Sequence, residues 1–140
     1  MKTILVDLNI ILDYLEDREG CDKAGEILAM CFQKELKGYV CAHEITTLSY
    51  YLWKTRKNRT ENMKIISRIL EVFDIIETGK TVLEKAVLSN NRDFEDAVII
   101  ESAKLRKVDC IITRNIKDFK NSPIPVMVPE EYLVQIKYNK

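Results

Sequence analysis

The chain opens with a short apolar run that changes, within about two residues, to helical spacing. Thr3 to Val6 is β-branched or aliphatic throughout, which is typical of a buried parallel strand. From Ile10 onward the apolar residues recur at helical spacing. Such a rapid change is typical of the carboxyl edge of an open α/β sheet, where ligands bind. Asp7 lies at this junction. It either binds a metal ion or phosphate there, or it begins a turn or caps the helix.

The same alternation continues along the chain. Stretches with helical spacing separate further short apolar runs, which predicts an α/β fold of parallel strands joined by helical crossovers. Further strands are expected at residues 39–42, 73–76, 110–112 and, at an edge, 126–128. Further helices are expected at about residues 24–36, 43–54, 60–73, 82–88, 93–107 and 129–133. Gly38 is expected to be a left-handed cap at the end of the helix over 24–36.

Length and composition predict one globular domain over residues 1–140, because 46% of the residues are hydrophobic and 31% are charged. The 22 basic residues balance the 22 acidic residues, so the net charge indicates no class of partner. No apolar run reaches membrane-spanning length, and Asp7 interrupts the N-terminal run too early for a signal peptide. We therefore expect a soluble, cytoplasmic protein.

The four cysteines lie far apart, form no CxxC pair and are accompanied by a single histidine. This pattern argues against a zinc cluster. Cys21, Cys31, Cys41 and Cys110 are expected to be free thiols in a reducing compartment.

Polar side chains gather where three of the expected strands end and at the start of one expected helix. They are Asp7 and Asn9 after the first strand, His43 and Glu44 after the second, Thr113, Arg114 and Asn115 after the fourth, and Asp93 and Asp96 at a helix start. Because the carboxyl ends of parallel strands share one edge, these groups are expected to converge. Carboxylate oxygens with few histidines or sulfurs select Mg²⁺ or Mn²⁺. Such ions assist phosphodiester hydrolysis by neutralising the phosphate and lowering the pKa of a bound water.

Each carboxylate also has a purely structural interpretation. Asp93 fits an N-cap, Glu44 is favourable in the first turn of any helix, and Asp118 suits the start of a turn. Asp96 is different, because it shares a helix stripe with the apolar Ile99. A carboxylate beside a buried face needs a partner or a metal ion.

Together these segments resemble the PIN-domain family of metal-dependent ribonucleases, which includes the VapC-type toxins of bacterial toxin–antitoxin pairs. The resemblance is carried by LVDLNIILDYLEDRE at the start, DFEDAVIIESAKLRKVDCIITRNIKDF in the second half, and IPVMVPEEYL near the end. It implies a PIN-like three-layer α/β/α fold, with a central parallel sheet of about four or five strands and an acidic edge that binds Mg²⁺ or Mn²⁺. It also implies an endoribonuclease acting as the toxin of a type II pair, with an RNA substrate, a cognate antitoxin and a homodimeric state.

The resemblance also assigns the catalytic acids and metal ligands. Asp7 matches the family's first acid and Asp96 its helix-borne acid, and Asn115 falls where many members carry a further acid. Many members place a second acid near the position of Thr47, which is not acidic here. Glu44, close to one helical turn earlier, is the available carboxylate. Glu44 either faces Asp7 and completes the site, directly or through water, or it faces solvent.

Four further residues match supporting positions of the family. Asn9 is the polar residue after the first acid, and Thr113 is the threonine near the site. Asp93 matches the extra acid of the DFED variant, and Asp118 matches the acid of the closing DF pair. The resemblance implies that these residues tune or complete the set of ligands.

A basic run follows the helix over 43–54. Contacts with the RNA backbone are assigned to Lys54, Arg56, Lys57 and Arg59 and, nearer to the acids, to Arg114 and Lys117. The other interpretation of the run is a solvated helix end whose side chains satisfy the last carbonyls.

Because Thr47 is not acidic where many family members carry the second acid, another function stays open. In this alternative the chain is a PIN-like module that binds RNA or a protein but cleaves poorly. An aspartyl-phosphate phosphatase is disfavoured, because that chemistry usually needs a second acid two residues after Asp7, where this chain has Asn9.

Overall fold

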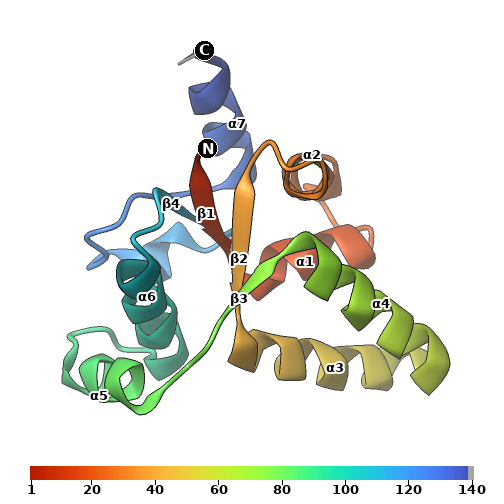
Figure 1. Cartoon of the computed structure of the whole chain (residues 1–140), viewed down its shortest axis with the longest axis horizontal. Coiled ribbons are helices and arrows are strands. Elements are labelled where there is room, and N and C mark those ends of the chain that lie inside the picture. The colour runs from red at the N-terminus through yellow and green to blue at the C-terminus, as the bar shows by residue number, and fades with distance from the viewer. Residues whose placement is uncertain (139–140) are drawn as a thin grey trace.

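A parallel sheet of five strands organises the chain (Figure 1). In the computed structural model, which describes residues 1–138, the strand order is β3-β2-β1-β4-β5. The strands are β1 (Thr3–Val6), β2 (Lys37–Cys41), β3 (Asp74–Ile76), β4 (Cys110–Ile112) and β5 (Val126–Met127). All five lie where the hydrophobic pattern predicts them, and β2 shows the largest shift because it begins at Lys37.

Helices occupy the connections between the strands. They are α1 (Leu8–Leu15), α2 (Cys21–Phe32), α3 (Ala42–Arg56), α4 (Arg59–Val72), α5 (Lys80–Leu88), α6 (Phe94–Arg106) and α7 (Pro129–Tyr138). A short 3-10 helix, η1 (Ile116–Phe119), precedes β5. Within residues 1–138, none of the helices has the length and apolar character needed to cross a bilayer.

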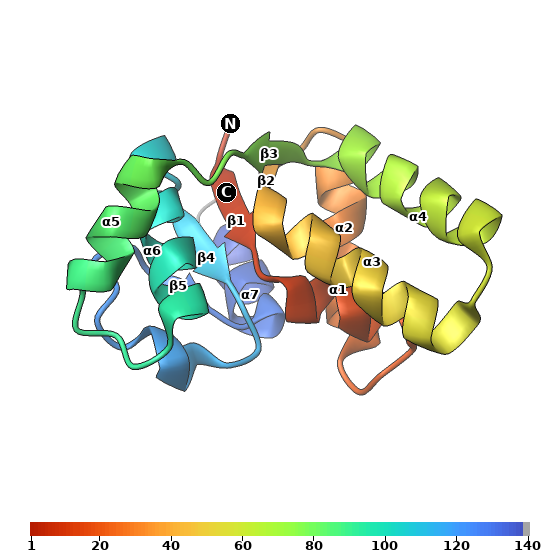
Figure 2. The same ribbon diagram turned by 90° about the horizontal axis from the view of Figure 1, so that it is seen from below.

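Each face of the sheet is covered by its own helices, because alternate strand residues point to opposite faces. Ile4 and Val6 of β1 pack into a core with side chains of α1, α2, α3, α4 and α7. Leu5 packs on the other face with Ile99 of α6. Figure 2 shows α5 and α6 on one side of the sheet and α1 to α4 on the other. The predicted three-layer α/β/α fold is therefore confirmed.

The direction in which the chain adds strands reverses beside β1. The chain first passes outward from β1 through β2 to β3, by way of α1 to α4. It then crosses the other face through α5 and α6 and returns to β4, which pairs with β1 on its free side. Open α/β sheets bind ligands at the carboxyl ends of the two strands that flank such a reversal. Asp7 follows β1 at this place, and Thr113 follows β4.

Gly38 has a different role from the predicted one. It lies inside β2, and the positive φ after α2 falls instead at Lys34, at 63°. The predicted left-handed cap at Gly38 is therefore wrong. A Cβ atom at this position would lie 2.7 Å from Sγ of Cys31 and 2.8 Å from the ring of Phe73. Only glycine therefore lets α2 and Phe73 approach the strand so closely.

Candidate active site

Asp7 lies at the carboxyl end of β1 and is buried, with only 8% of its surface exposed. It occupies the N-cap position of α1, but its side chain makes no capping hydrogen bond. Instead, Oγ1 of Thr113 donates a hydrogen bond of 2.8 Å to Oδ2 of Asp7, and Nδ2 of Asn9 donates one of 3.2 Å to the same oxygen. Asp7 thus begins α1 as its N-cap residue, but its side chain does not cap the helix. Thr113 and Asn9 fix the orientation of its carboxylate.

Glu44 is brought to Asp7 by the abrupt passage from β2 into α3. Its side chain is fully buried, and Oε2 accepts a hydrogen bond of 2.9 Å from the backbone amide of Leu8. Burial, followed by the charge of Asp7, raises the pKa of Glu44 well above its ordinary value. Its second oxygen, Oε1, is buried with no hydrogen-bond partner. The solvent-facing alternative for Glu44 is therefore wrong.

Thr47, near the usual place of the second acid, turns back on its own helix. Its Oγ1 atom donates a hydrogen bond of 3.2 Å to the carbonyl of His43. The ring Nδ1 atom of His43 lies 3.4 Å from Oγ1 of Thr78. Burial lowers the pKa of His43, although the charges of Glu95 and Asp7 act in the opposite direction. His43 therefore borders the acidic site as a mostly neutral ring.

The start of α6 supplies the next two carboxylates. Oδ1 of Asp93 accepts hydrogen bonds from the amides of Glu95, at 2.9 Å, and Asp96, at 3.2 Å. The N-cap interpretation of Asp93 is therefore confirmed. Asp96 is half-buried one turn further along the helix. Burial raises the pKa of Asp96 to about 7, and the charges of Asp93 and Asp7 act in the same direction.

The loop after β4 places the remaining candidates. Asn115 is exposed, and its amide donates a hydrogen bond of 3.2 Å to Oγ1 of Thr113. Asp118 is exposed on η1, and its charge also contributes to the raised pKa of Asp96. The carbonyl of Asp118 accepts a hydrogen bond of 3.0 Å from Nδ2 of Asn91. Both predicted residues therefore lie at the rim of the site.

An ion pair between a buried carboxylate and an exposed arginine, which the sequence did not indicate, supports this loop. Asp13 of α1 is 4% exposed and pairs with Arg114, and Arg18 lies 3.7 Å from the same carboxylate. Oδ1 of Asn9 also accepts a hydrogen bond of 3.3 Å from the amide of Arg114. The signal that could have found Asp13 is its i+4 spacing from Asn9, which places both on one face of α1. Glu95 was also missed, although it lies one residue before Asp96.

The basic run, which spans the last turn of α3 and the residues after it, lies far from the acids. With a rise of about 1.5 Å per residue, Arg56 is about 18 Å along α3 from Glu44. Arg56 donates a hydrogen bond of 3.2 Å to the carbonyl of Leu15 at the end of α1. Lys54, Lys57 and Arg59 are exposed. The run therefore divides into one arginine that binds another helix and three cations that face solvent.

The carboxylates fit a hard divalent cation in their chemistry. Within residues 1–138, no three acidic, histidine or cysteine side chains already surround a common point where an ion would bind. The buried, unpartnered Oε1 of Glu44 beside Asp7 is nevertheless an acceptor that a cation would satisfy. A cation would also offset the burial and the neighbouring negative charges that raise the pKa of Asp96. Asp7, Glu44 and Asp96 are therefore the residues that would hold it.

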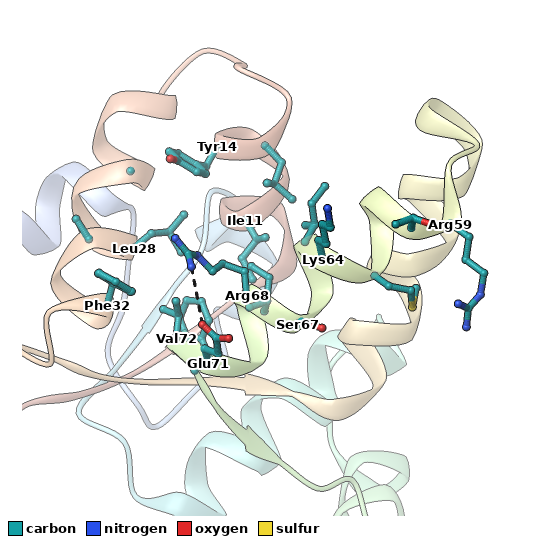
Figure 3. A pocket seen from close by; sticks show the side chains of 18 residues that line it. Ile11, Tyr14, Leu28, Phe32, Arg59, Lys64, Ser67, Arg68, Glu71 and Val72 are labelled. Atoms are coloured by element: carbon teal, nitrogen blue, oxygen red, sulfur yellow. Dashed lines mark ion pairs between the residues drawn. The ribbon is translucent and has the colours of Figure 1, made fainter.

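A large cavity lies elsewhere, between α1, α2 and α4. It has a volume of about 980 Å³, and none of the site's acidic residues lines it. Figure 3 shows Ile11, Leu28 and Val72 along this hollow, with Arg68 and Glu71 forming an ion pair of 4.0 Å. This apolar groove, lined by α1, α2 and α4, is separate from the polar site at the sheet edge.

The PIN domain family model matches residues 3–117 of this chain. No curated protein sequence matches the chain significantly. A toxin–antitoxin complex from Klebsiella pneumoniae contains a similar chain, with 23% identity, a TM-score of 0.67, and coverage of 90% of this chain and 97% of that one.

Two further solved structures are also similar in fold. VapBC2 from Rickettsia felis, bound to a DNA fragment from its promoter, gives 18% identity and a TM-score of 0.66, over 89% of this chain and 96% of that one. VapC20 from Mycobacterium tuberculosis, a sarcin-ricin loop cleaving toxin, gives 16% identity and a TM-score of 0.61, over 77% of this chain and 86% of that one. At these low identities, the TM-scores show a shared fold and no more.

Proposed function

Because the chain belongs to the PIN-domain family, we propose that it is a metal-dependent endoribonuclease and the toxin of a type II toxin–antitoxin pair. The observation that carries this proposal is the buried contact between Asp7 and Glu44, in which one carboxylate oxygen of Glu44 has no partner. Two carboxyl groups are buried together at a strand edge at a high energetic cost, which a bound cation offsets.

The residues of the site divide into ligands and residues that orient them. Asp7, Glu44 and Asp96 hold the divalent ion, with Asn115 as a further ligand. When bound, the ion neutralises the RNA phosphate and lowers the pKa of an attacking water. Thr113 keeps the Asp7 carboxylate in its orientation through the 2.8 Å hydrogen bond.

The other supporting residues act around these ligands. Asn9 donates to Asp7, Asp93 keeps the first turn of α6 in place, and Asp118 adds negative charge near Asp96. Because the donors are carboxylate and amide oxygens, we propose Mg²⁺ or Mn²⁺ as the ion.

Cleavage of single-stranded RNA tests the proposal directly. We expect Mn²⁺- or Mg²⁺-dependent cleavage by the wild-type chain and a loss of at least about 100-fold in Asp7→Asn and Asp96→Asn. Asp74→Asn is the matched control, because Asp74 is an exposed aspartate at the opposite edge of the same sheet, at the start of β3. Circular dichroism would verify that all three variants fold.

Two results would overturn the nuclease assignment. One is cleavage that persists in both Asp7→Asn and Asp96→Asn, and the other is cleavage that persists in excess EDTA. RNA binding by the wild-type chain without any product at saturating Mn²⁺ would instead favour a PIN-like binding module.

The toxin role is supported by the solved relatives, which include toxin–antitoxin complexes. We expect growth arrest on expression of the wild-type chain and normal growth on expression of Asp7→Asn. Co-expression of the small protein encoded beside this chain's gene should restore growth if that protein is the cognate antitoxin. Growth arrest by Asp7→Asn would contradict a nuclease toxin.

We propose that the antitoxin covers the apolar groove between α1, α2 and α4. Tyr14 and Phe32 line this groove and keep 51% and 56% of their surfaces exposed, so both rings are accessible to a partner that fills it. Phe32→Asp should weaken antitoxin binding at least tenfold without changing RNA cleavage. Tyr138→Asp is the control, because Tyr138 is exposed at the end of α7, outside the groove.

A homodimer and RNA contacts by the basic run complete the proposal. Sedimentation velocity at micromolar concentration would show a dimer of the 140-residue chain, and a monomer would contradict the expectation.

Lys54, Lys57 and Arg59 extend the RNA path beyond the site, whereas Arg56 and Arg114 are engaged by Leu15 and Asp13.

A further inference from the structure

A second cavity, of about 330 Å³, lies between the loop that joins α5 to α6 and the 3-10 helix η1. It is lined by polar and charged residues: Asn90, Asn91, Arg92, Asp93, Lys117, Asp118, Lys120 and Asn121. We call it the loop cleft. Its polar lining distinguishes it from the apolar groove between α1, α2 and α4.

The loop cleft presents cations that are available to a ligand. Arg92, Lys117 and Lys120 are exposed, and within residues 1–138 none of them forms a salt bridge. Of the two carboxylates that line the cleft, that of Asp93 already accepts two backbone hydrogen bonds at the start of α6. Three cations against two carboxylates leave a positive balance of charge in the cleft, which suits phosphate groups.

The amide side chains of the cleft have two different roles. Asn91 joins its walls, because Nδ2 donates to the carbonyl of Asp118 at 3.0 Å and Oδ1 accepts from the amide of Asp93 at 2.9 Å. Asn90 and Asn121 are exposed and form no side-chain hydrogen bond in the described part of the chain. Free amides of this kind bind the donor and acceptor edges of unpaired bases.

The loop cleft adjoins the candidate active site. Asp93 and Asp118 line the cleft, and their charges also act on Asp96. Phe94, which follows Asp93, keeps 50% of its surface exposed. An exposed aromatic ring two residues from a cation, as Phe94 is from Arg92, suits the stacking of bases of single-stranded nucleic acid.

We infer that the loop cleft binds the nucleotides of single-stranded RNA that flank the scissile phosphate. Arg92, Lys117 and Lys120 bind the flanking phosphates, Asn90 and Asn121 bind base edges, and Phe94 stacks on a base. This inference rests on the proposed ribonuclease function and identifies where its substrate lies. It places the primary RNA contacts beside the acids and gives the distant residues after α3 a secondary role.

Binding of a random-sequence single-stranded RNA 20-mer, measured by fluorescence anisotropy, tests the inference. All variants are made in the Asp7→Asn background, so that the probe stays intact. The triple variant Arg92→Gln/Lys117→Gln/Lys120→Gln should bind at least tenfold more weakly than its parent. The slope of log K against log salt should fall by about 2, because each phosphate contact on a single strand contributes about 0.7.

The control triple variant, Lys2→Gln/Lys23→Gln/Lys137→Gln, removes the same charge from exposed positions outside both the cleft and the acidic site. It should bind the RNA within about twofold of the parent. Phe94→Leu keeps an apolar side chain but removes the ring, and it should weaken binding about tenfold, in the range of one lost base stack.

Cleavage by the wild-type chain separates this inference from the proposed function. If the wild-type chain cleaves RNA and the loop-cleft triple variant leaves both KM and binding unchanged, the cleft assignment is wrong and the ribonuclease assignment stands. Equal weakening by the two triple variants would also overturn the cleft, because net charge alone would then explain it. Absence of both RNA binding and cleavage in the wild-type chain would overturn both proposals.

Discussion

Oε2 of Glu44 accepts a hydrogen bond of 2.9 Å from the amide of Leu8, the residue that follows Asp7. This bond joins the first turn of α3 to the first turn of α1 and fixes one carboxylate oxygen. The other oxygen, Oε1, is buried without a partner. Glu44 is thus held by the backbone beside the carboxylate of Asp7, and its second oxygen is the unsatisfied acceptor of the site.

Removing the charge of Glu44 should stabilise the metal-free protein. Burial and Asp7 raise the pKa of Glu44, so the folded state favours the protonated form. Stability should therefore fall as the pH rises above the ordinary value of 4.5, where the unfolded chain ionises first. At pH 8 in EDTA, Glu44→Gln should gain about 1–3 kcal/mol of unfolding free energy, measured by urea denaturation, while RNA cleavage is lost.

The matched variant Glu44→Ala should have the opposite effect on stability. It removes the acceptor for the amide of Leu8 and leaves a cavity, which costs about 2–3 kcal/mol. Equal destabilisation by Glu44→Gln and Glu44→Ala would show that shape, and not charge, dominates at this position.

Metal affinity should depend on the ionisation of Asp96. Because burial raises the pKa of Asp96 to about 7, Mn²⁺ must displace a proton from this carboxyl group below pH 7. Titration calorimetry should therefore show affinity rising by up to about tenfold per pH unit between pH 5 and 7 and levelling off above. The metal-free protein should lose stability over the range from about 4 to about 7, in which the unfolded carboxyl group ionises before the folded one.

The variant Asp96→Asn provides the control for this pH dependence. It should bind Mn²⁺ more weakly and with a flatter pH profile below 7. An unchanged slope in Asp96→Asn would assign the displaced proton to another group, with Glu44 as the first candidate because its pKa is also raised.

The sequence predicted the sheet and the position of Asp7 at a strand end because both depend on local patterns. A short apolar run followed by Asp7 and a helix identifies a strand end without any tertiary information. The orientation of Glu44 was ambiguous from sequence. Glu44 lies three residues before Thr47 and so keeps nearly the same helix face, but the position of α3 along its axis decides whether Glu44 reaches Asp7. The structure removes the ambiguity, since α3 begins at Ala42, directly after β2.

Two features lay beyond sequence analysis because they depend on contacts between distant segments. The pair of Asp13 and Arg114 spans 101 residues, and Asp13 looks like an ordinary charged residue near a helix end. Gly38 follows a helix and so resembles a cap, but its small size is required by Cys31 and Phe73, which pack against it from α2 and from the end of α4. The i+4 spacing of Asn9 and Asp13 indicates a shared helix face, but no local pattern in the sequence indicates either long-range contact.

Adding a methyl group at position 38 should therefore destabilise the protein. In Gly38→Ala the new Cβ would lie within 3.0 Å of both Cys31 and Phe73. Overpacking of this kind costs about 1–3 kcal/mol, measured as a lower urea midpoint with an unchanged m-value. Gly79→Ala is the control, because nothing lies within 4 Å of its Cβ position, and it should change stability by no more than about 0.5 kcal/mol. Equal effects of the two substitutions would contradict the steric explanation.

The stability of the protein should change little when either Arg18 or Arg114 is lost, but should fall when both are lost. The buried carboxylate of Asp13 pairs with Arg114 and lies 3.7 Å from Arg18, so each guanidinium compensates for loss of the other. Urea denaturation should show a cost of about 1 kcal/mol or less for Arg18→Gln and for Arg114→Gln, and about 3 kcal/mol for the double variant, whose buried charge is uncompensated. Adding Asp13→Asn to the double variant should recover most of that loss, because it removes the unpaired charge. Additive single costs, or no recovery with Asp13→Asn, would show that the two arginines do not share the neutralisation of Asp13.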